Sequence, residues 1–335
     1  MAATDAFTYN REASQVPGLP RHQLEGPELT LETIFYPWGF PLLVRTNSQE
    51  VLTQCGQLWG EFKPRHDTEI IRADVQVTQG NSSECPPAPS YRVMSSFFIA
   101  AADPDNYCVV DIDRCHSQLV ISENTLRYPL YAQYFLLCIP ASCTATRYMT
   151  PVHAGCVAWK NRGVLLCGDS GAGKSTLSYA CARAGWTYLS DDATFLMNDD
   201  DSRMVIGNSH LVRFRPSAAE LFPELDGLEI TPRSAGKPSV ELPTVQLTGI
   251  QCAETTHADF VVFLNRRWSG PPEIVPYSKD AARTSMRQVL YAPLNARLVQ
   301  YQTIERLLNA EVVELRYTDL DRAIERLQTL VQEGQ

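Results

Sequence analysis

The stretch from Gly168 to Ser175 carries the clearest chemical signal of the chain. It reads GDSGAGKS and fits the pattern G-x-x-x-x-G-K-[ST]. The apolar run GVLLC precedes it and predicts a strand, and STLSYACARAG follows it and predicts a helix. Glycines in such a turn let successive backbone N–H groups point inward at the helix N-terminus, where they bind anions. The pattern therefore predicts a loop that binds phosphate.

Each position of this loop has an expected part in binding a nucleoside triphosphate. Lys174 would bring a positive charge to the β- and γ-phosphates, and the Ser175 hydroxyl would be a ligand of Mg²⁺. ATP and Mg²⁺ are thus the cofactors that the loop predicts. The residues assigned to nucleotide binding here are Gly168, Asp169, Ser170, Gly171, Ala172, Gly173, Lys174, Ser175 and Thr176.

An acidic pair, Asp191-Asp192, follows the apolar run TYLS. In a parallel sheet this spacing places the pair at the C-terminal end of a strand, beside the phosphate loop. One carboxylate there would hold Mg²⁺, and the other would accept a proton from a hydroxyl nucleophile; Asp192 joins Ser175 as an expected metal ligand. The alternative is an ordinary turn or helix N-cap, where Asp is common.

His153 lies in the run PVHAGCVAW, ahead of the loop. A hairpin at Lys160-Asn161-Arg162 would pair this run with GVLLC. His153 would then lie either near the phosphate loop or at the opposite end of the sheet, and the sequence does not choose between the two. A single histidine is more often structural than catalytic, and both interpretations stay open at this point.

Basic residues beyond the loop are further candidates for contact with a nucleotide. Arg213 and Arg215 lie two apart in HLVRFR, so on a strand they share one face. Lys237 lies in the segment RSAGKPSVEL. Charge-neutralising groups of this kind assist phosphoryl transfer, and we assign Arg213 and Lys237 to nucleotide binding, with Arg215 ranked below them. The alternative is a solvated strand face and a flexible loop.

Together, His153, the loop GDSGAGKS and the pair Asp191-Asp192 resemble the catalytic domain of the HPr serine kinase/phosphorylase family. The likeness covers about residues 150–200 and continues more weakly to about residue 330. The fold of that family is similar to phosphoenolpyruvate carboxykinase around its P-loop. The resemblance implies an α/β fold with a P-loop kinase domain of this type, preceded by a smaller α+β domain.

The resemblance also implies roles for individual residues. Lys174 and Ser175 would bind phosphate and Mg²⁺, one carboxylate of the acidic pair would be the base toward a substrate serine, and His153 would tune that carboxylate. The glycine-rich, Arg-containing segment that true HPr kinases carry after the acidic pair is not found. The chain therefore resembles a divergent bacterial relative whose acceptor, a protein or peptide, the sequence does not identify; a homo-oligomer is a further implication.

The elements that must position these residues suggest three parts. Residues 1–28 are polar and rich in proline, which predicts a flexible lead-in. Residues 29–127 predict an α+β domain made mostly of antiparallel strands, with YRVMSSFFIAA as one of them. Residues 128–335 predict the P-loop domain. Helices beyond the one after the loop are expected after Asn47 or Ser48 with Glu50 in a capping box, over 128–139 ending near Pro140, from Pro216 to about Leu225, and after a cap at Thr318 or Asp319.

Composition excludes several classes of protein. The chain has 335 residues with 29 Lys plus Arg against 38 Asp plus Glu, a net charge of −9, which argues against nucleic acid or an anionic membrane as partner. The N-terminus has no apolar core of signal-peptide length, and the apolar part of the run between Arg127 and Arg147, about a dozen residues, is short for a bilayer span. The ten cysteines form no CxxC pair, so we expect them to be reduced and structural. A cytoplasmic location is the expectation.

Four functions fit a P-loop of this kind. The leading hypothesis is a Mg²⁺-dependent kinase that transfers the γ-phosphoryl group of ATP to a serine hydroxyl. The alternatives are a non-catalytic nucleotide sensor or scaffold and a kinase of a small metabolite. A transporter ATPase subunit would need an LSGGQ-like segment and a later strand ending in Asp-Glu, and the sequence contains neither.

Overall fold

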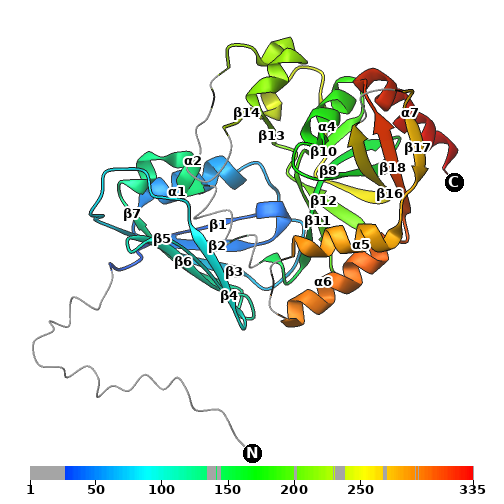
Figure 1. Cartoon of the computed structure of the whole chain (residues 1–335). Coiled ribbons are helices and arrows are strands. Elements are labelled where there is room, and N and C mark those ends of the chain that lie inside the picture. Colours follow the sequence, from blue (N-terminus) through cyan, green and yellow to red (C-terminus); the bar gives the residue numbers. More distant parts are fainter. Residues whose placement is uncertain are drawn as a thin grey trace, which may run out of the picture.

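The protein is a mixed α/β structure with several sheets, shown by a computed structural model (Figure 1). The structure describes residues 27–133, 141, 145–199, 202–228, 230, 238–266, 270–290, 292 and 294–334. Residues 1–26 of the expected lead-in and residues 134–139 of the expected helix over 128–139 lie outside these residues. Within that helix, the described part contains α2, Pro129–Tyr131.

A seven-stranded sheet occupies the N-terminal part, in the order β1-β2-β3-β7-β6-β5-β4. The two pairs that β3 makes are parallel, and the other four pairs are antiparallel, so the sheet is mostly antiparallel. Its strands are β1 (Leu31–Phe35), β2 (Leu42–Thr46), β3 (Ile71–Thr78), β4 (Ser90–Met94), β5 (Phe97–Asp103), β6 (Asn106–Asp111) and β7 (His116–Ser122).

Helix α1, Gln49–Trp59, connects β2 to its parallel neighbour β3. It buries Val51, Cys55 and Trp59, which recur at helical spacing on one face. Ser48 occupies the N-cap position, but the expected capping box does not form. Its side chain makes no cap hydrogen bond, and the Glu50 carboxylate accepts a hydrogen bond from Gln54 instead.

Two other local expectations are wrong. The run YRVMSSFFIAA is not one strand but the hairpin of β4 and β5, because Ser95 adopts a left-handed φ of 54° and turns the chain. The segment after β13 is not one helix. It forms two short 3₁₀ turns, Pro216–Glu220 and Pro223–Leu225, because Pro223 has no N–H to continue the first of them.

A nine-stranded sheet forms the rest of the framework, with the main order β15-β10-β8-β11-β12-β16-β18-β17 and β9 paired to both β8 and β16. The two long strands each pair with three others. β8 pairs with β9, β10 and β11, and β16 pairs with β9, β12 and β18. Its strands are β8 (Met149–Trp159), β9 (Arg162–Cys167), β10 (Thr187–Ser190), β11 (Ala193–Met197), β12 (Met204–Gly207), β15 (Gln251–Cys252), β16 (Thr255–Arg266), β17 (Glu273–Pro276) and β18 (Glu311–Tyr317). Strands β13 (Leu211–Phe214) and β14 (Val240–Pro243) form a separate pair.

Helices cover both faces of the central strands of this sheet (Figure 1). Val164 and Leu166 of β9 face the core shared with α4 (Lys174–Arg183) and α7 (Leu320–Glu333). Leu165 and Cys167 face the core shared with α5 (Lys279–Gln288) and α6 (Leu294–Leu307). This alternation is why GVLLC is apolar throughout: both faces of the strand are buried. The α7 helix starts at an Asp319 cap, as expected.

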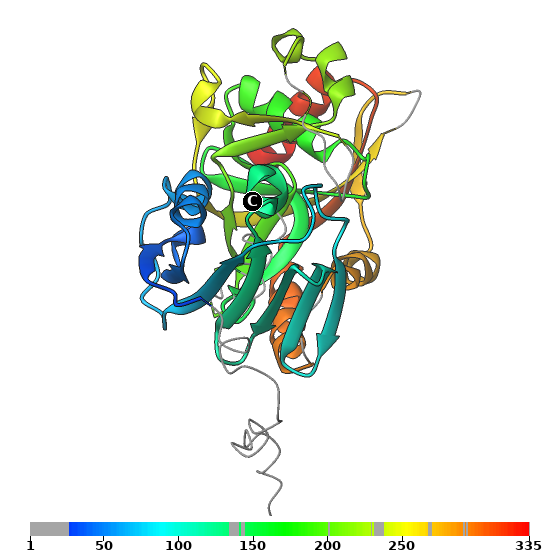
Figure 2. The same ribbon diagram turned by 90° about the vertical axis from the view of Figure 1, so that its left-hand side faces the viewer.

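The two sheets share a hydrophobic core (Figures 1 and 2). Met149, Phe195 and Ile206 of the second sheet belong to the same buried cluster as the strands of the first. The Trp38 ring lies 4.9 Å from the ring of Phe195. The first sheet thus packs directly on the strands that follow the acidic pair, while the division at residue 127 stays a prediction.

Two expectations from composition can be compared with the described residues. Each of the eight cysteines among them is free. In that same part of the chain, no helix combines the length and the apolar character needed to cross a bilayer.

Candidate functional site

The loop between β9 and α4 contains three glycines with left-handed backbones. Gly168, Gly171 and Gly173 have φ values of 149°, 97° and 99°. Gly173 is the N-cap of α4, and a Cβ there would lie 2.8 Å from the Tyr317 hydroxyl. Residues with side chains rarely adopt this conformation, so the glycine spacing of the motif has a direct geometric cause.

Lys174 lies at the centre of the candidate site. Its side chain is only 5% exposed, and its ammonium group donates to the Gly168 carbonyl at 2.8 Å. It also lies 3.0 Å from His153 Nε2 and 3.9 Å from Asp192 Oδ1. Burial lowers the pKa of Lys174, while Asp192 opposes that shift. The cation is therefore aimed at the loop and at the acidic pair together.

The structure answers where His153 lies: it is beside the loop of residues 168–175. In the β8–β9 hairpin, Ala154 pairs with Cys167, the last residue of β9, so His153 stands level with the start of the loop. On its other side His153 pairs with Ala193 of β11, the residue after the acidic pair. The strand β8 thus carries the histidine between the two motifs.

The contacts of His153 define its protonation. Burial and the neighbouring Lys174 lower its pKa against the opposing effect of Asp192, which favours a neutral ring at pH 7. Since the lysine ammonium can only donate, His153 Nε2 accepts from it. The proton is then on Nδ1, which lies 3.1 Å from Asp192 Oδ1 and donates to it. His153 therefore links the lysine to Asp192 in one polar chain.

The acidic pair forms the two-residue connection between β10 and β11. β9 and β10 are both antiparallel to β8, so they run in the same direction and end at the same edge of the sheet. The pair thus lies beside the loop as expected, although an antiparallel strand separates the two parallel ones. Ser190 and Thr194 flank the pair, and their hydroxyls contact each other at 2.6 Å while Thr194 donates to the Ala154 carbonyl.

The two carboxylates have different surroundings. Asp191 accepts a hydrogen bond from the Arg213 amide at 3.2 Å. Burial raises the pKa of Asp191 to about 6, with Arg213 opposing the shift and Asp192 adding to it. The Asp192 side chain is 47% exposed and faces His153 and Lys174. The two groups are thus differentiated by burial and by partners.

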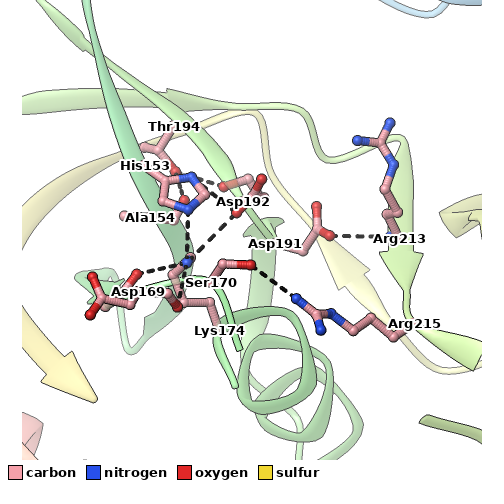
Figure 3. A network of polar contacts seen from close by, with 12 residues as sticks. His153, Ala154, Asp169, Ser170, Lys174, Asp191, Asp192, Thr194, Arg213 and Arg215 are labelled. Atoms are coloured by element: carbon pink, nitrogen blue, oxygen red, sulfur yellow. Dashed lines mark hydrogen bonds and ion pairs between the residues drawn. The ribbon is translucent and has the colours of Figure 1, made fainter. Parts of the chain in front are cut away.

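The basic candidates separate in the structure (Figure 3). The Arg213 guanidinium contacts Glu241 of β14 at 3.2 Å, and the Arg213 backbone amide donates to Asp191 of the acidic pair. Arg215, ranked lower from the sequence, extends to the phosphate loop, where its Nη2 donates to Ser170 Oγ at 2.9 Å. Lys237 lies outside the described residues.

Three features of the site had no place among the sequence predictions. The Tyr317 hydroxyl, at the end of β18, donates to the Ala172 carbonyl at 3.3 Å and supports the loop from below. Gly155 of β8 leaves room for α4, because a Cβ there would lie 2.3 Å from Ser178 Oγ. The sequence carries a signal for the Ser190–Thr194 contact, because SDDAT has hydroxyl residues on both sides of the acidic pair. The other two depend on strand order.

The residues present fit Mg²⁺ bound together with phosphate rather than in a cage made of protein ligands. Ser175 and Thr176 lie in the first turn of α4, and Asp192 presents a half-exposed carboxylate beside that turn. Among the described residues no group of three or more His, Cys, Asp and Glu side chains gathers as a metal site. Mg²⁺ typically takes one or two protein oxygens, and phosphate and water complete its shell.

Comparison with known proteins leaves the family of the chain open. No family model matches the sequence, and no curated protein matches it. The solved structure of the Hpr(Ser) kinase/phosphatase from Coxiella burnetii is a distant structural neighbour, with a TM-score of 0.32 and 16% sequence identity. The alignment covers 55% of this chain and 99% of that one. Conclusions about function therefore depend on the chain's own residues.

Proposed function

We propose that the protein is a Mg²⁺-dependent kinase that transfers the γ-phosphoryl group of ATP to a hydroxyl, that of a serine in a protein or peptide. One observation carries the proposal: the loop lysine, His153 and Asp192 form one polar chain, and Asp191 lies directly beside it. A phosphate-binding cation and a carboxylate base are thereby held within one small site. Phosphoryl transfer needs this combination of positioning and charge neutralisation.

In the proposed reaction, the loop amides and Lys174 hold the β- and γ-phosphates of ATP. Asp191 accepts the proton of the acceptor hydroxyl, the hydroxyl oxygen forms a bond to the γ-phosphorus, and the bond to the β-phosphate oxygen breaks, so that ADP leaves. Asp191 suits this role because its raised pKa, about 6, is closer to neutral pH than that of an ordinary carboxylate. Bound Mg²⁺, held by Ser175 and Asp192, would neutralise phosphate charge.

His153 keeps Asp192 and Lys174 in place through its two ring nitrogens. A neutral ring accepts from Lys174 and donates to Asp192, so it adds no further positive charge to the site. It therefore connects the lysine to the carboxylate, which lie 3.9 Å apart, and fixes the ammonium beside the loop where phosphate would bind.

Arg215 is expected to strengthen nucleotide binding, and Arg213 is not. Arg215→Ala removes the guanidinium that contacts Ser170 Oγ, and we expect the Kd for ATP to rise by about three- to tenfold, which corresponds to the net contribution of a typical hydrogen bond, about 0.5–1.5 kcal/mol. Arg213→Ala is the matched control, because its guanidinium faces Glu241. Calorimetric titration with ATP would measure both; equal weakening by the two variants contradicts the assignment.

The proposed function is tested by incubating the protein with γ-labelled ATP and Mg²⁺ in an extract of its own cells. We expect a labelled protein or peptide band that is absent when the Lys174→Ala variant replaces the wild type. The label should be stable to acid conditions that hydrolyse phosphohistidine, as phosphoserine is. Tight ATP binding without labelling of any acceptor would contradict a kinase and favour the nucleotide sensor.

A further inference from the structure

A short segment of the N-terminal part, residues Phe62–His66, contacts His210 and Glu254, which directly precede β13 and β16. The segment follows α1. Its Phe62 side chain is only 5% exposed, and its ring meets the His210 ring edge-on at 4.7 Å. Arg65 Nε donates to Glu254 Oε2 at 2.9 Å. The other oxygen of Glu254 lies 3.5 Å from His210 Nε2. His210 Nε2 has no hydrogen-bond partner among the described residues, so its ring is placed by packing against Phe62 and by its position beside Glu254.

Glu254 is itself fixed on the edge of the second sheet. Its carbonyl accepts from the Gly207 amide at 2.9 Å, and the neighbouring Ala253 amide donates to the Tyr188 carbonyl of β10 at 3.0 Å. Its side chain is only 14% exposed. The Arg65–Glu254 ion pair thus attaches the N-terminal segment to the strand that ends in the acidic pair.

His210 in turn directly precedes β13, which reaches the acidic pair. The Leu211 carbonyl accepts a hydrogen bond from the Tyr188 hydroxyl at 3.0 Å. Two residues later the Arg213 amide donates to Asp191 Oδ2 at 3.2 Å (Figure 3). Strand β13 therefore contacts both Tyr188 of β10 and Asp191 after it. The position of the Asp191 carboxylate thus depends on the position of β13.

The backbone of the segment is prearranged by the turn at Trp38-Gly39. The Gly39 carbonyl accepts from the amides of both Arg65 and His66, at 3.0 and 3.1 Å. Gly39 has a φ of 88°, and a Cβ there would lie 2.8 Å from the Arg65 Cβ. Arg65 is thus presented to Glu254 from a fixed backbone, which reduces the entropy lost on forming the ion pair.

We propose that Arg65 is a positioning residue for phosphoryl transfer: through Glu254, His210 and β13 it keeps the Asp191 carboxylate in place. The expected effect of Arg65 on the rate rests on the proposed function, whereas the structural link from Arg65 to Asp191 does not. Under this proposal the N-terminal part of the chain contributes to the reaction through Arg65, although none of the residues assigned to catalysis or nucleotide binding lies in that part. Misplacement of a reacting group by about 1 Å can reduce a rate by up to about a hundredfold.

The test compares Arg65→Ala with Arg65→Lys and with Arg45→Ala. Arg45 is a matched control because it is 45% exposed, against 42% for Arg65, and pairs with Asp74 inside the first sheet. For Arg65→Ala we expect kcat to fall roughly tenfold and the KM for ATP to stay within about twofold. Arg65→Lys should recover most of kcat, and Arg45→Ala should leave both constants unchanged.

A second readout requires no catalysis. In the ATP-free protein, Arg65→Ala should shift the NMR resonance of the Arg213 amide and speed its hydrogen exchange, and Arg45→Ala should do neither. The positioning proposal is overturned if Arg65→Ala matches Arg45→Ala in the Arg213 amide. If Arg65→Ala alters the Arg213 amide but leaves kcat unchanged, the proposed effect on rate is overturned. If the wild type transfers no phosphate, the proposed function is contradicted. The Arg213 amide would still test the structural link between Arg65 and Asp191.

Discussion

Replacing Lys174 by Ala is expected to raise the Kd for ATP by about ten- to a hundredfold and to abolish phosphoryl transfer. The ammonium is 5% exposed and is fixed by the Gly168 carbonyl and His153 at the mouth of the loop. A buried charge-assisted contact to phosphate contributes about 1.5–3 kcal/mol, and loss of the upper value corresponds to about a hundredfold in affinity. Titration calorimetry with ATP and Mg²⁺ would measure the change.

Two further variants keep this prediction specific to the charge. Lys174→Met retains most of the buried aliphatic stem and should bind ATP as poorly as Lys174→Ala, because only the ammonium matters. Lys279→Ala removes an exposed lysine at the start of α5 and should bind ATP as the wild type does. Undiminished ATP binding by Lys174→Met would remove the basis for the phosphate loop.

The parts of the site that the sequence predicts are contiguous in the chain. Glycines, lysine and helix start occur within one short stretch, and local backbone geometry requires them there: Gly168, Gly171 and Gly173 all adopt left-handed φ values. The apolar run GVLLC likewise predicts a strand, and the structure contains that strand with both faces buried. Such features depend on neighbours in the sequence, so no knowledge of strand order is needed.

The position of His153 could not be predicted, because it depends on strand order. Two arrangements were open for the histidine, and the decision comes from β8 lying between β9 and β10. That order brings His153 level with the start of the loop on one side and with Ala193 on the other. The pairing joins residues far apart in the chain, for which the sequence carries no local signal.

The ranking of the two arginines shows the same limit. A continuous strand over HLVRFR would place Arg213 and Arg215 on one face, but β13 ends at Phe214 and Pro216 begins a 3₁₀ turn. Arg215 therefore leaves the strand and reaches Ser170. The Arg213 side chain pairs with Glu241 of β14. That strand is not predicted from the sequence.

Asp191→Asn is expected to lower kcat by about 10²–10⁴-fold, the contribution of a general base, while making the protein more stable at neutral pH. Burial raises the pKa of Asp191 to about 6 in the folded protein. A carboxylate with a raised pKa opposes folding when it is ionised, so its cost is fully present above pH 6 and disappears as the pH falls toward 4. Asparagine can still accept from the Arg213 amide and carries no charge.

The size and the pH dependence of both effects follow from the same group. Solvent reaches part of the Asp191 side chain, so we expect a gain of about 1 kcal/mol in the free energy of unfolding at pH 7.5. Denaturant titrations should show this gain shrinking below pH 6. In the wild type, kcat/KM should fall as the pH drops below about 6, because protonated Asp191 cannot accept the acceptor's proton.

Opposite signs for rate and stability separate a base from a structural carboxylate. If Asp191 only fixed the turn between β10 and β11, its replacement would lower stability and rate together. Asp113→Asn, at an exposed turn of the first sheet, should change neither. A less stable Asp191→Asn variant would contradict the raised pKa, and unchanged transfer would assign the base to another group. Because a site that keeps a costly carboxylate must gain function from it, a stabilised but inactive variant would identify Asp191 as a functional residue and not a structural one.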